Sequence, residues 1–253
     1  MKRSICIVMT LLLCVAFLSV GVSAKTYHLS DTDLSIRLDD TIWYVFTRDN
    51  LDNNPELGEL GISYDDMHDI LYDNEAYMDA IVCYEDGDYL EMFIRKRALD
   101  NGLVNLTNYS YDRVLEMAEQ LAEKQGSKTY SVYENRYKFA RLEYFDSGVN
   151  CDVCEYITVI NKDNYTLTFQ SENGFADWEY EQMENIVDSI QFDVDPSLEE
   201  EEDGGFFGNV LTPPVGGAVI GGAVGAVVGL VNKKKKKAAQ ENETPPVNGP
   251  ELG

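Results

Sequence analysis

Alternation of apolar and polar positions is the clearest pattern in the middle of the chain. Tyr165, Leu167 and Phe169 alternate with two threonines and a glutamine, which is typical of a strand with one buried face. Five further runs rich in apolar and aromatic residues occupy residues 80–84, 89–94, 128–134, 138–146 and 153–161. Short turn-forming sequences separate these runs, so the spacing predicts a hairpin followed by an antiparallel meander of four strands.

Helical spacing interrupts the strands at three places. Residues 111–125 carry one apolar stripe, and Gly126 directly after it is typical of a helix C-cap. The members of the stripe are Val114, Met117, Ala118, Leu121 and Ala122. Residues 63–66 resemble a capping box before a helix that places Met67, Ile70 and Leu71 on one face, and a third helix is predicted over 176–189. Strands with a few dispersed helices predict the α+β class, an antiparallel sheet with packed helices.

Two apolar segments lie outside this region. Residues 1–24 begin with Met1-Lys2-Arg3, continue through an apolar stretch and end in small residues before Lys25, as a secretory signal peptide does. An uncleaved N-terminal anchor is the alternative, and both place the following domain outside the cytoplasm. Residues 215–231 form a second uncharged run, long enough to span a bilayer core as a helix.

A run of five lysines follows the second apolar segment and predicts its orientation. The lysines are Lys233, Lys234, Lys235, Lys236 and Lys237. By the positive-inside rule they place the C-terminal end in the cytoplasm. The expected order is a signal peptide (1–24), an exported α+β domain (25–193), an acidic linker rich in glycine and proline (194–214), a transmembrane helix (215–231) and a basic, then disordered tail (232–253). We therefore expect a single-pass protein of the cell membrane with its N-terminal domain outside.

The predicted transmembrane segment has a four-residue glycine period. Its glycines at this spacing are Gly217, Gly221, Gly225 and Gly229. Overlapping GxxxG steps form a groove on one helix face, into which a second helix fits closely, so self-association is one expectation. A weakly hydrophobic anchor without a defined partner is equally compatible with the pattern. Because glycine weakens membrane insertion, a segment that associates with the bilayer without spanning it also remains open.

The net charge of the exported part limits which kinds of molecule it can bind. Residues 25–214 carry 13 basic and 42 acidic side chains, a formal charge of −29. Such a surface repels nucleic acid and anionic headgroups, so nucleic-acid binding is not expected for the exported part. Cationic partners and loosely held divalent cations are favoured. The simplest effect of the acidity is to keep an exported domain soluble and monomeric.

The chain contains no recognisable catalytic, cofactor or metal motif. Cys151 and Cys154 have C-x-x-C spacing but precede a strand rather than a helix, and residues three apart on a strand point to opposite faces. A disulfide between Cys83 and one of them is an alternative to unpaired thiols. Two histidines with one C-x-x-C fall short of a zinc site, and the loop around Asp49 and Asp52 lacks the spacing of a calcium loop. His28 and His68 are expected to be ordinary surface or boundary residues.

The order of the predicted elements resembles the exported domains of the PsbP-like fold. A short strand pair at 34–38 and 43–46 opens the domain, the meander follows, and the last helix closes into residues 186–192. The resemblance covers residues 26–193. It implies a scaffold for binding or assembly and carries over no catalytic residue. This chain departs from the lipoprotein members of the fold in having a predicted C-terminal anchor.

Two functional classes follow. The first is a membrane-anchored protein whose acidic exported domain binds an unknown protein or ligand, with no enzymatic activity. The second is a cell-surface enzyme whose site no linear motif reveals. A deep pocket with converging polar side chains would favour the enzyme, and a shallow surface with exposed tyrosines would favour binding.

Overall fold

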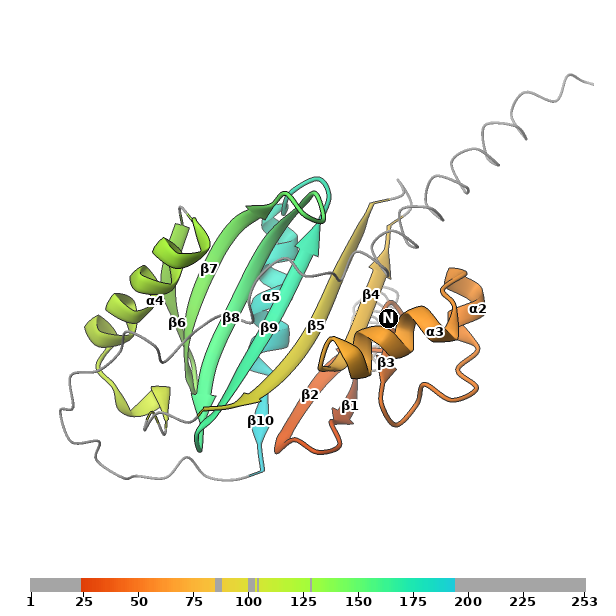
Figure 1. Ribbon diagram of the computed structural model, residues 1–253, viewed down its shortest axis with the longest axis horizontal. Coiled ribbons are helices and arrows are strands. Elements are labelled where there is room, and N and C mark those ends of the chain that lie inside the picture. Colours follow the sequence, from red (N-terminus) through yellow and green to blue (C-terminus); the bar gives the residue numbers. More distant parts are fainter. Residues whose placement is uncertain (1–23, 85–87, 100–102, 104, 128, 194–253) are drawn as a thin grey trace, which may run out of the picture.

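The computed structural model describes residues 24–84, 88–99, 103, 105–127 and 129–193 (Figure 1). The strands are β1 (Ala24–His28), β2 (Leu34–Asp39), β3 (Tyr44–Thr47), β4 (Ala76–Cys83), β5 (Tyr89–Ala98), β6 (Thr129–Glu134), β7 (Lys138–Asp146), β8 (Cys151–Ile160), β9 (Asp163–Ser171) and β10 (Gln191–Phe192). The helices are α2 (Glu56–Leu60), α3 (Tyr64–His68), the π-helix η1 (Asp69–Asp73), the 3-10 helix η2 (Leu106–Asn108), α4 (Tyr111–Gln125) and α5 (Asp177–Asp188).

The strands form two antiparallel sheets. The small sheet has the order β1-β2-β10, and the large sheet has the order β3-β4-β5-β9-β8-β7-β6. The predicted meander is confirmed, because β6, β7, β8 and β9 pair in succession, and the predicted hairpin is β4 with β5. Strand β5 also pairs with β9, which joins the hairpin to the meander. The predicted α+β class with an antiparallel sheet and packed helices is therefore confirmed.

The predicted opening strand pair is wrong. Strand β2 lies in the small sheet, whereas β3 pairs with β4 at the edge of the large sheet. A tight turn lies between them, in which the amides of Ile42 and Trp43 both donate to the carbonyl oxygen of Asp39 at 3.2 and 3.1 Å. This turn leads the chain from one sheet to the other. A short connection favours pairing of neighbouring strands but does not require it.

Helix α4 follows the prediction closely. Ser110 caps its first turn, with its hydroxyl accepting from the Arg113 amide at 3.3 Å. Gly126 ends it in the left-handed conformation, with φ of 72°. All five members of the predicted apolar stripe are buried. They pack with Ala140, Ile157 and Val159 of the large sheet, so α4 covers one end of that sheet.

The second predicted helix is only partly α-helical. Ser63 caps it as predicted, accepting from the Asp66 amide at 3.1 Å. Beyond His68, however, the segment continues as the π-helix η1, which brings the Asn74 amide to the Asp69 carbonyl oxygen at 2.8 Å. The predicted apolar face is buried. The π turn was not predicted, because a single short apolar face fits both helical periods.

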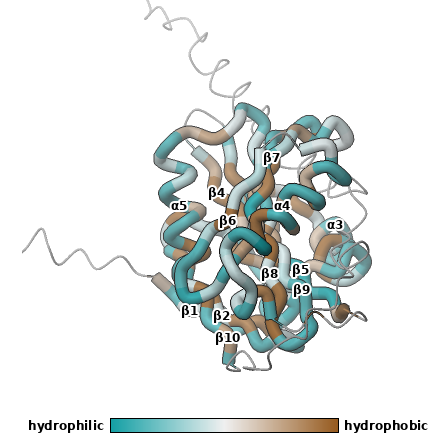
Figure 2. Tube along the Cα trace, turned by 90° about the vertical axis from the view of Figure 1, so that its left-hand side faces the viewer, coloured by the Kyte–Doolittle hydropathy of each residue, from teal (hydrophilic) through white to brown (hydrophobic). Residues whose placement is uncertain are grey.

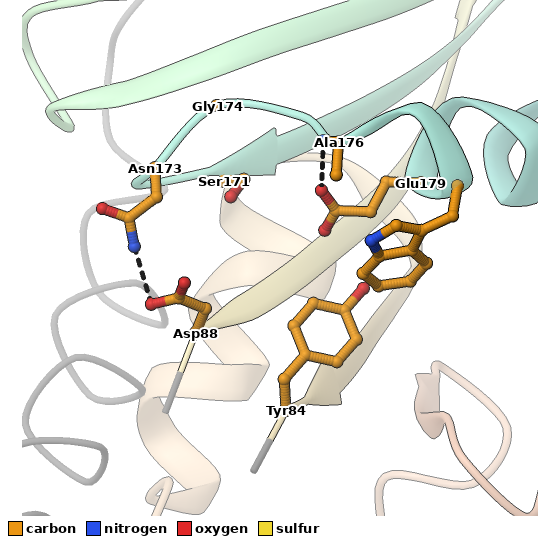
Figure 3. Close-up of a pocket in the computed structure, with 8 residues that line it drawn as sticks. Tyr84, Asp88, Ser171, Asn173, Gly174, Ala176 and Glu179 are labelled. Atoms are coloured by element: carbon orange, nitrogen blue, oxygen red, sulfur yellow. Dashed lines mark hydrogen bonds between the residues drawn. The ribbon is translucent and has the colours of Figure 1, made fainter. Parts of the chain in front are cut away.

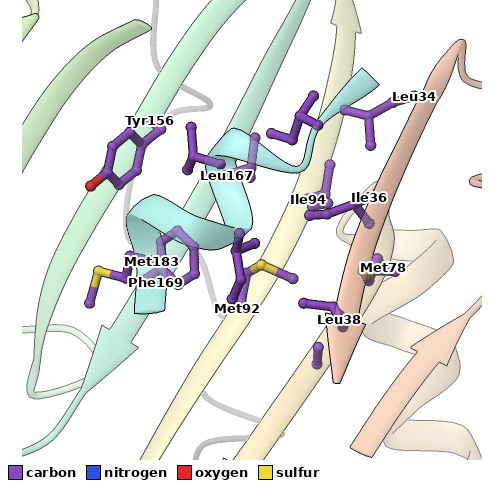
Figure 4. Packing of buried hydrophobic residues seen from close by; sticks show 14 of the residues in the cluster. Leu34, Ile36, Leu38, Met78, Met92, Ile94, Tyr156, Leu167, Phe169 and Met183 are labelled. Atoms are coloured by element: carbon purple, nitrogen blue, oxygen red, sulfur yellow. The ribbon is translucent and has the colours of Figure 1, made fainter. Parts of the chain in front are cut away.

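The core lies on both faces of the large sheet. Helix α5 and the small sheet cover one face, and α4 and the α3–η1 segment cover the other (Figure 1). Figure 4 shows side chains of the small sheet, the large sheet and α5 packing together in the first of these layers. The labelled members are Leu34, Ile36, Leu38, Met78, Met92, Ile94, Tyr156, Leu167, Phe169 and Met183. In Figure 2 the hydrophobic stretches lie mainly within the strands, whereas much of the outward-facing chain is hydrophilic.

Several sequence predictions fall outside the described residues. These are the signal segment up to residue 23, the linker at 194–214, the glycine-rich segment at 215–231 and the tail at 232–253. Within the part of the chain that the structure describes, no helix is both long enough and apolar enough to span a bilayer.

Candidate functional site

A pocket of about 450 Å³ lies at one end of the large sheet, where the β4–β5 hairpin meets the connection from β9 to α5 (Figure 3). Its volume is within the range of small-ligand sites. The lining residues are Tyr84, Asp88, Ser171, Asn173, Gly174, Ala176, Trp178 and Glu179. The pocket therefore combines the end of a hairpin with the start of a helix.

Hydrogen bonds fix the hairpin side of the pocket. The Tyr84 amide donates to the Asp88 carbonyl oxygen at 2.8 Å, which sets the spacing of the two strand ends. The Asn173 side-chain amide donates to the Asp88 carboxylate at 2.6 Å, so the hairpin is joined to the β9–α5 connection. Gly174 follows with φ of 78°, a left-handed conformation that glycine adopts without steric cost. The Asp88 carboxylate is thereby held at the rim.

The first turn of α5 supplies the opposite wall. The Glu179 carboxylate accepts from the Ala176 amide at 2.7 Å, which satisfies one of the unpaired amides at the helix start. Glu179 is only 5% exposed. Figure 3 shows its carboxylate between Ala176 and Tyr84. A buried carboxylate held by the helix backbone is thus positioned before any ligand arrives.

Two aromatic rings complete the pocket. Tyr84 and Trp178 meet edge to face, with ring centroids 5.0 Å apart and an interplanar angle of 75°. Trp178 is 50% exposed, which is high for so large an apolar side chain. An exposed tryptophan beside a fixed tyrosine offers an electron-rich surface to a ligand.

The charge of the pocket is negative. Two of its lining residues, Asp88 and Glu179, carry carboxylates, and none of the eight is a lysine, arginine or histidine. Carboxylates and the faces of aromatic rings both attract cations, and a partly enclosed site strengthens that attraction by excluding water. The arrangement is therefore suited to a positively charged group.

The cysteines of the described residues, Cys83, Cys151 and Cys154, lie elsewhere and are not joined by a disulfide. Cys151 and Cys154 occupy the same strand three residues apart, roughly 10 Å between Cα atoms, which is too far for a disulfide. Cys83 is separated from that strand by β5 and β9, about three strand spacings or roughly 14 Å. The alternative of a cross-strand disulfide from Cys83 is therefore wrong. Burial raises the pKa of the Cys154 thiol to about 12, which opposes redox reactivity.

The acidic loop and the histidines also have structural partners. Asp49 accepts from the Ser30 hydroxyl, and Asp52 accepts from the Tyr64 hydroxyl at 3.1 Å. Among the described residues, no three histidine, cysteine or acidic side chains are grouped to hold a metal ion. His28 contacts the Ser35 hydroxyl at 2.7 Å, and His68 stacks on Tyr72 with centroids 4.6 Å apart. The predicted membrane residues, the four glycines and five lysines, lie outside the described residues.

The pocket was not predicted from the sequence. Tyr84 and Trp178 are far apart in the chain, and each reads by itself as an ordinary aromatic residue at the end of an element. The order of strands in the large sheet and the turn of the chain from β9 into α5 together bring them close. The four-residue spacing of Tyr64, His68 and Tyr72 was likewise not used in the sequence prediction, although it would place the three rings on one helix face.

Comparison with solved structures gives a structural likeness. No protein-family model matches the chain, and the comparison with curated proteins finds no match. The chain is similar to the solution structure of cyanobacterial PsbP (CyanoP) from Synechocystis sp. PCC 6803 at 12% sequence identity and a TM-score of 0.35. The match covers 69% of this chain and 95% of the other. The predicted resemblance to the PsbP-like fold is confirmed as a weak likeness, and it concerns the fold alone.

Proposed function

We propose that this chain is a membrane-anchored binding protein whose acidic domain, residues 25–193, lies outside the cytoplasm. Its site is the pocket between Tyr84 and Trp178, and its ligand is a small molecule or terminal group with a positive charge. The observation that carries the proposal is the pairing of an exposed aromatic edge-to-face contact with two fixed carboxylates in one pocket.

The fixed carboxylates support binding of a cation. Asp88 is held by Asn173, and Glu179 is held by the backbone of Ala176, so little rearrangement is needed when a ligand arrives. A cation over a tyrosine or tryptophan ring contributes about 0.5–2 kcal/mol, depending on how far it is desolvated. The net charge of the surrounding domain adds long-range attraction.

The lining residues support binding rather than catalysis. Ser171 places a hydroxyl in the pocket, but neither a histidine nor a cysteine is among the residues that line it. A serine needs an adjacent base to act as a nucleophile. The proposed role is therefore recognition, with no cofactor and no catalytic residue.

The membrane part of the proposal rests on sequence. Residues 215–231 form a single spanning helix, the lysines at 233–237 hold its C-terminal end in the cytoplasm, and the glycine groove pairs it with a second copy. The bilayer and a second copy of this chain are thus two proposed partners, and the ligand outside is a third. Pairing two anchors would place two pockets close together and strengthen binding to a multivalent cationic partner.

Tryptophan fluorescence tests the pocket. The chain has two tryptophans, of which Trp43 is buried at 4% exposure and Trp178 lines the pocket. The full chain in a non-ionic detergent is titrated with tetramethylammonium and with N-acetyl-arginine amide at constant ionic strength. We expect a saturable change in emission that disappears in Trp178→Phe. Glu179→Gln keeps an acceptor for the Ala176 amide but removes the charge, and it should weaken binding about tenfold.

Glu181→Gln is the matched control, because Glu181 is an exposed acid on the same helix. It should leave the affinity unchanged. If neither cation changed the emission, or if both glutamine variants weakened binding equally, the pocket would not be a cation site.

A further inference from the structure

Five planar side chains follow one another in contact, three on the α3–η1 segment and two, Arg48 and Tyr77, after β3 and on β4. We call this row the aromatic ladder; in order it consists of Tyr77, Arg48, Tyr72, His68 and Tyr64. The Arg48 guanidinium carbon lies 4.0 Å from the Tyr77 ring centroid and 5.1 Å from that of Tyr72. His68 stacks on Tyr72 at 4.6 Å and meets Tyr64 at 5.9 Å. None of these residues lines the pocket.

The helical segment and a neighbouring loop hold the ladder in place. Residues four apart lie on one helix face, and the capped start at Ser63 fixes where that face begins. The Tyr64 hydroxyl donates to the Asp52 carboxylate at 3.1 Å, which ties the outer ring to the loop before α2. Tyr64 is 45% exposed and Tyr72 is 44% exposed. The rings are therefore ordered and still accessible.

Arg48 shows which chemical group the ladder accepts. Its guanidinium lies between two tyrosine rings, and its Nε donates to the carbonyl oxygens of Leu71 at 2.9 Å and Ala76 at 3.1 Å. A guanidinium is planar and stacks on aromatic faces, whereas an ammonium does not. The inner end of the ladder is thus completed by an arginine of the chain itself.

At its outer end the ladder presents the aromatic ring of Tyr64, and several carboxylates lie nearby. Exposed carboxylates of Asp65, Asp66, Asp69 and Asp73 lie along the same helical segment as Tyr64 and Tyr72. Residues 49–94 contain fourteen acidic side chains and no lysine or arginine. The four exposed carboxylates of the α3–η1 segment make this surface complementary in charge to a basic partner, and Arg48 is the ladder's own cation.

We infer that the aromatic ladder is a docking surface for an arginine-rich segment of a partner protein. One partner arginine stacks on Tyr64 and continues the alternation of ring and guanidinium that Arg48 begins, while Asp65 and Asp52 balance its charge. The inference goes beyond the proposed function, because it assigns a protein partner to a second surface. Arginine is preferred to lysine since stacking requires a planar cation.

The test uses the full chain in a non-ionic detergent and fluorescein-labelled penta-arginine, followed by fluorescence anisotropy. We expect saturable binding, and weaker binding of penta-lysine of the same charge. Tyr64→Ala should reduce the affinity for penta-arginine about fivefold, and Tyr64→Phe should retain it because the ring remains. Tyr111→Ala is the matched control, since Tyr111 is 47% exposed at the start of α4 and lies outside the ladder.

Each contrary result would point to a different explanation of the binding. Equal affinity for penta-lysine, or an equal loss in Tyr111→Ala, would show general attraction to an acidic surface and would overturn the inference. Displacement of penta-arginine by maltohexaose would identify a glycan surface instead. Glu179→Gln separates the two sites: a loss of penta-arginine binding in that variant would place the peptide in the pocket. Unchanged binding there, with a loss in Tyr64→Ala, supports the ladder even if the pocket proposal fails.

Discussion

Asp79 and Glu91 lie diagonally across the paired strands β4 and β5, on the same face of the large sheet, and both are completely buried. Gln170 donates to one Glu91 oxygen. The second Glu91 oxygen and both Asp79 oxygens have no hydrogen-bond donor among the described residues. Two carboxylates only accept hydrogen bonds, so a proton on one of them allows it to donate to the other. The pair is thus built to retain a proton.

This pair predicts that the domain is more stable in mild acid. Burial raises the pKa of both carboxyls, and the charge of Glu91 raises that of Asp79 further. Unfolded carboxyls ionise near pH 4, so the folded state holds more protons above that pH. The stabilisation is complete below about pH 4 and is lost as the pH rises through the higher native pKa values. We expect a larger free energy of unfolding at pH 5 than at pH 8, measured by urea titration followed by tryptophan fluorescence.

The variant Asp79→Asn separates this pair from other acids. Asparagine stays neutral and can donate to Glu91, so the variant should be more stable than the parent at pH 8 and should have a shallower pH dependence. One proton corresponds to about 1.4 kcal/mol per pH unit. Glu155, whose pKa burial also raises, accounts for part of the remaining slope. Asp40→Asn, at an exposed site, is the control; an equal gain in that variant would mean that general charge repulsion, not the buried pair, sets the pH dependence.

Replacing two glycines by alanine should change the stability of the domain in opposite directions. An added Cβ meets no atom within 4 Å at either Gly126 or Gly58, so crowding plays no part. Gly126 has φ of 72°, and Gly126→Ala should destabilise the domain by about 1 kcal/mol. Gly58 lies within α2, and Gly58→Ala should be neutral or stabilising by up to about 1 kcal/mol. Thermal unfolding of the two variants beside the parent measures both; a loss in Gly58→Ala would contradict the conformational explanation.

The three cysteines of the domain should remain thiols in air. Strand spacing separates Cys83 from the other two, and Cys151 and Cys154 are too far apart along one strand. Non-reducing peptide mapping by mass spectrometry should therefore find no disulfide within the domain. At pH 8 iodoacetamide should modify Cys83 before Cys154, because Cys83 is partly exposed and Cys154 is fully buried with a pKa of about 12. Faster labelling of Cys154 would show that β8 opens readily.

Self-association through the proposed glycine groove can be tested independently of the pocket and the aromatic ladder. Gly221→Leu with Gly225→Leu fills the groove and should abolish self-association of the full chain in liposomes, measured by energy transfer between labelled copies. Val219→Leu with Val227→Leu changes the opposite helix face and should leave association intact. If association survives both pairs of changes, the segment is an anchor without a pairing surface.

The sequence predicted the helices and strands themselves better than it predicted which strands pair with one another. The residues of α4 and its Gly126 cap follow from local spacing, and so do the four strands of the meander. The pairing of β2 with β10 could not be predicted, because β10 has only two residues and meets a strand more than 150 positions earlier. Local patterns contain no information about which sheet a short strand joins.

The pocket and the buried pair Asp79 and Glu91 were not predicted from the sequence, for related reasons. Asp79 and Glu91 are isolated acidic residues in mostly apolar stretches, and acidic side chains are rarely buried completely. They are buried because both faces of the large sheet are covered, one by α5 and the small sheet and the other by α4 and the α3–η1 segment. Tyr84 and Trp178 meet through the strand order β4-β5-β9 together with the turn of the chain from β9 into α5.

Strand β10 is where a pulling force from the proposed membrane anchor would enter the domain. It joins the domain through two residue pairs with β2, a backbone bond from Asp193 to Asp33 at 2.8 Å, and the ring of Phe192 between Tyr137 and Tyr165. In the proposed topology the membrane lies beyond residue 193, so any tension between a bound partner and the bilayer acts on β10 first. Such tension would first load the two residue pairs of β10 with β2 and the contacts of Phe192 with Tyr137 and Tyr165. The domain would then lengthen its tether under force before its binding surfaces were disturbed.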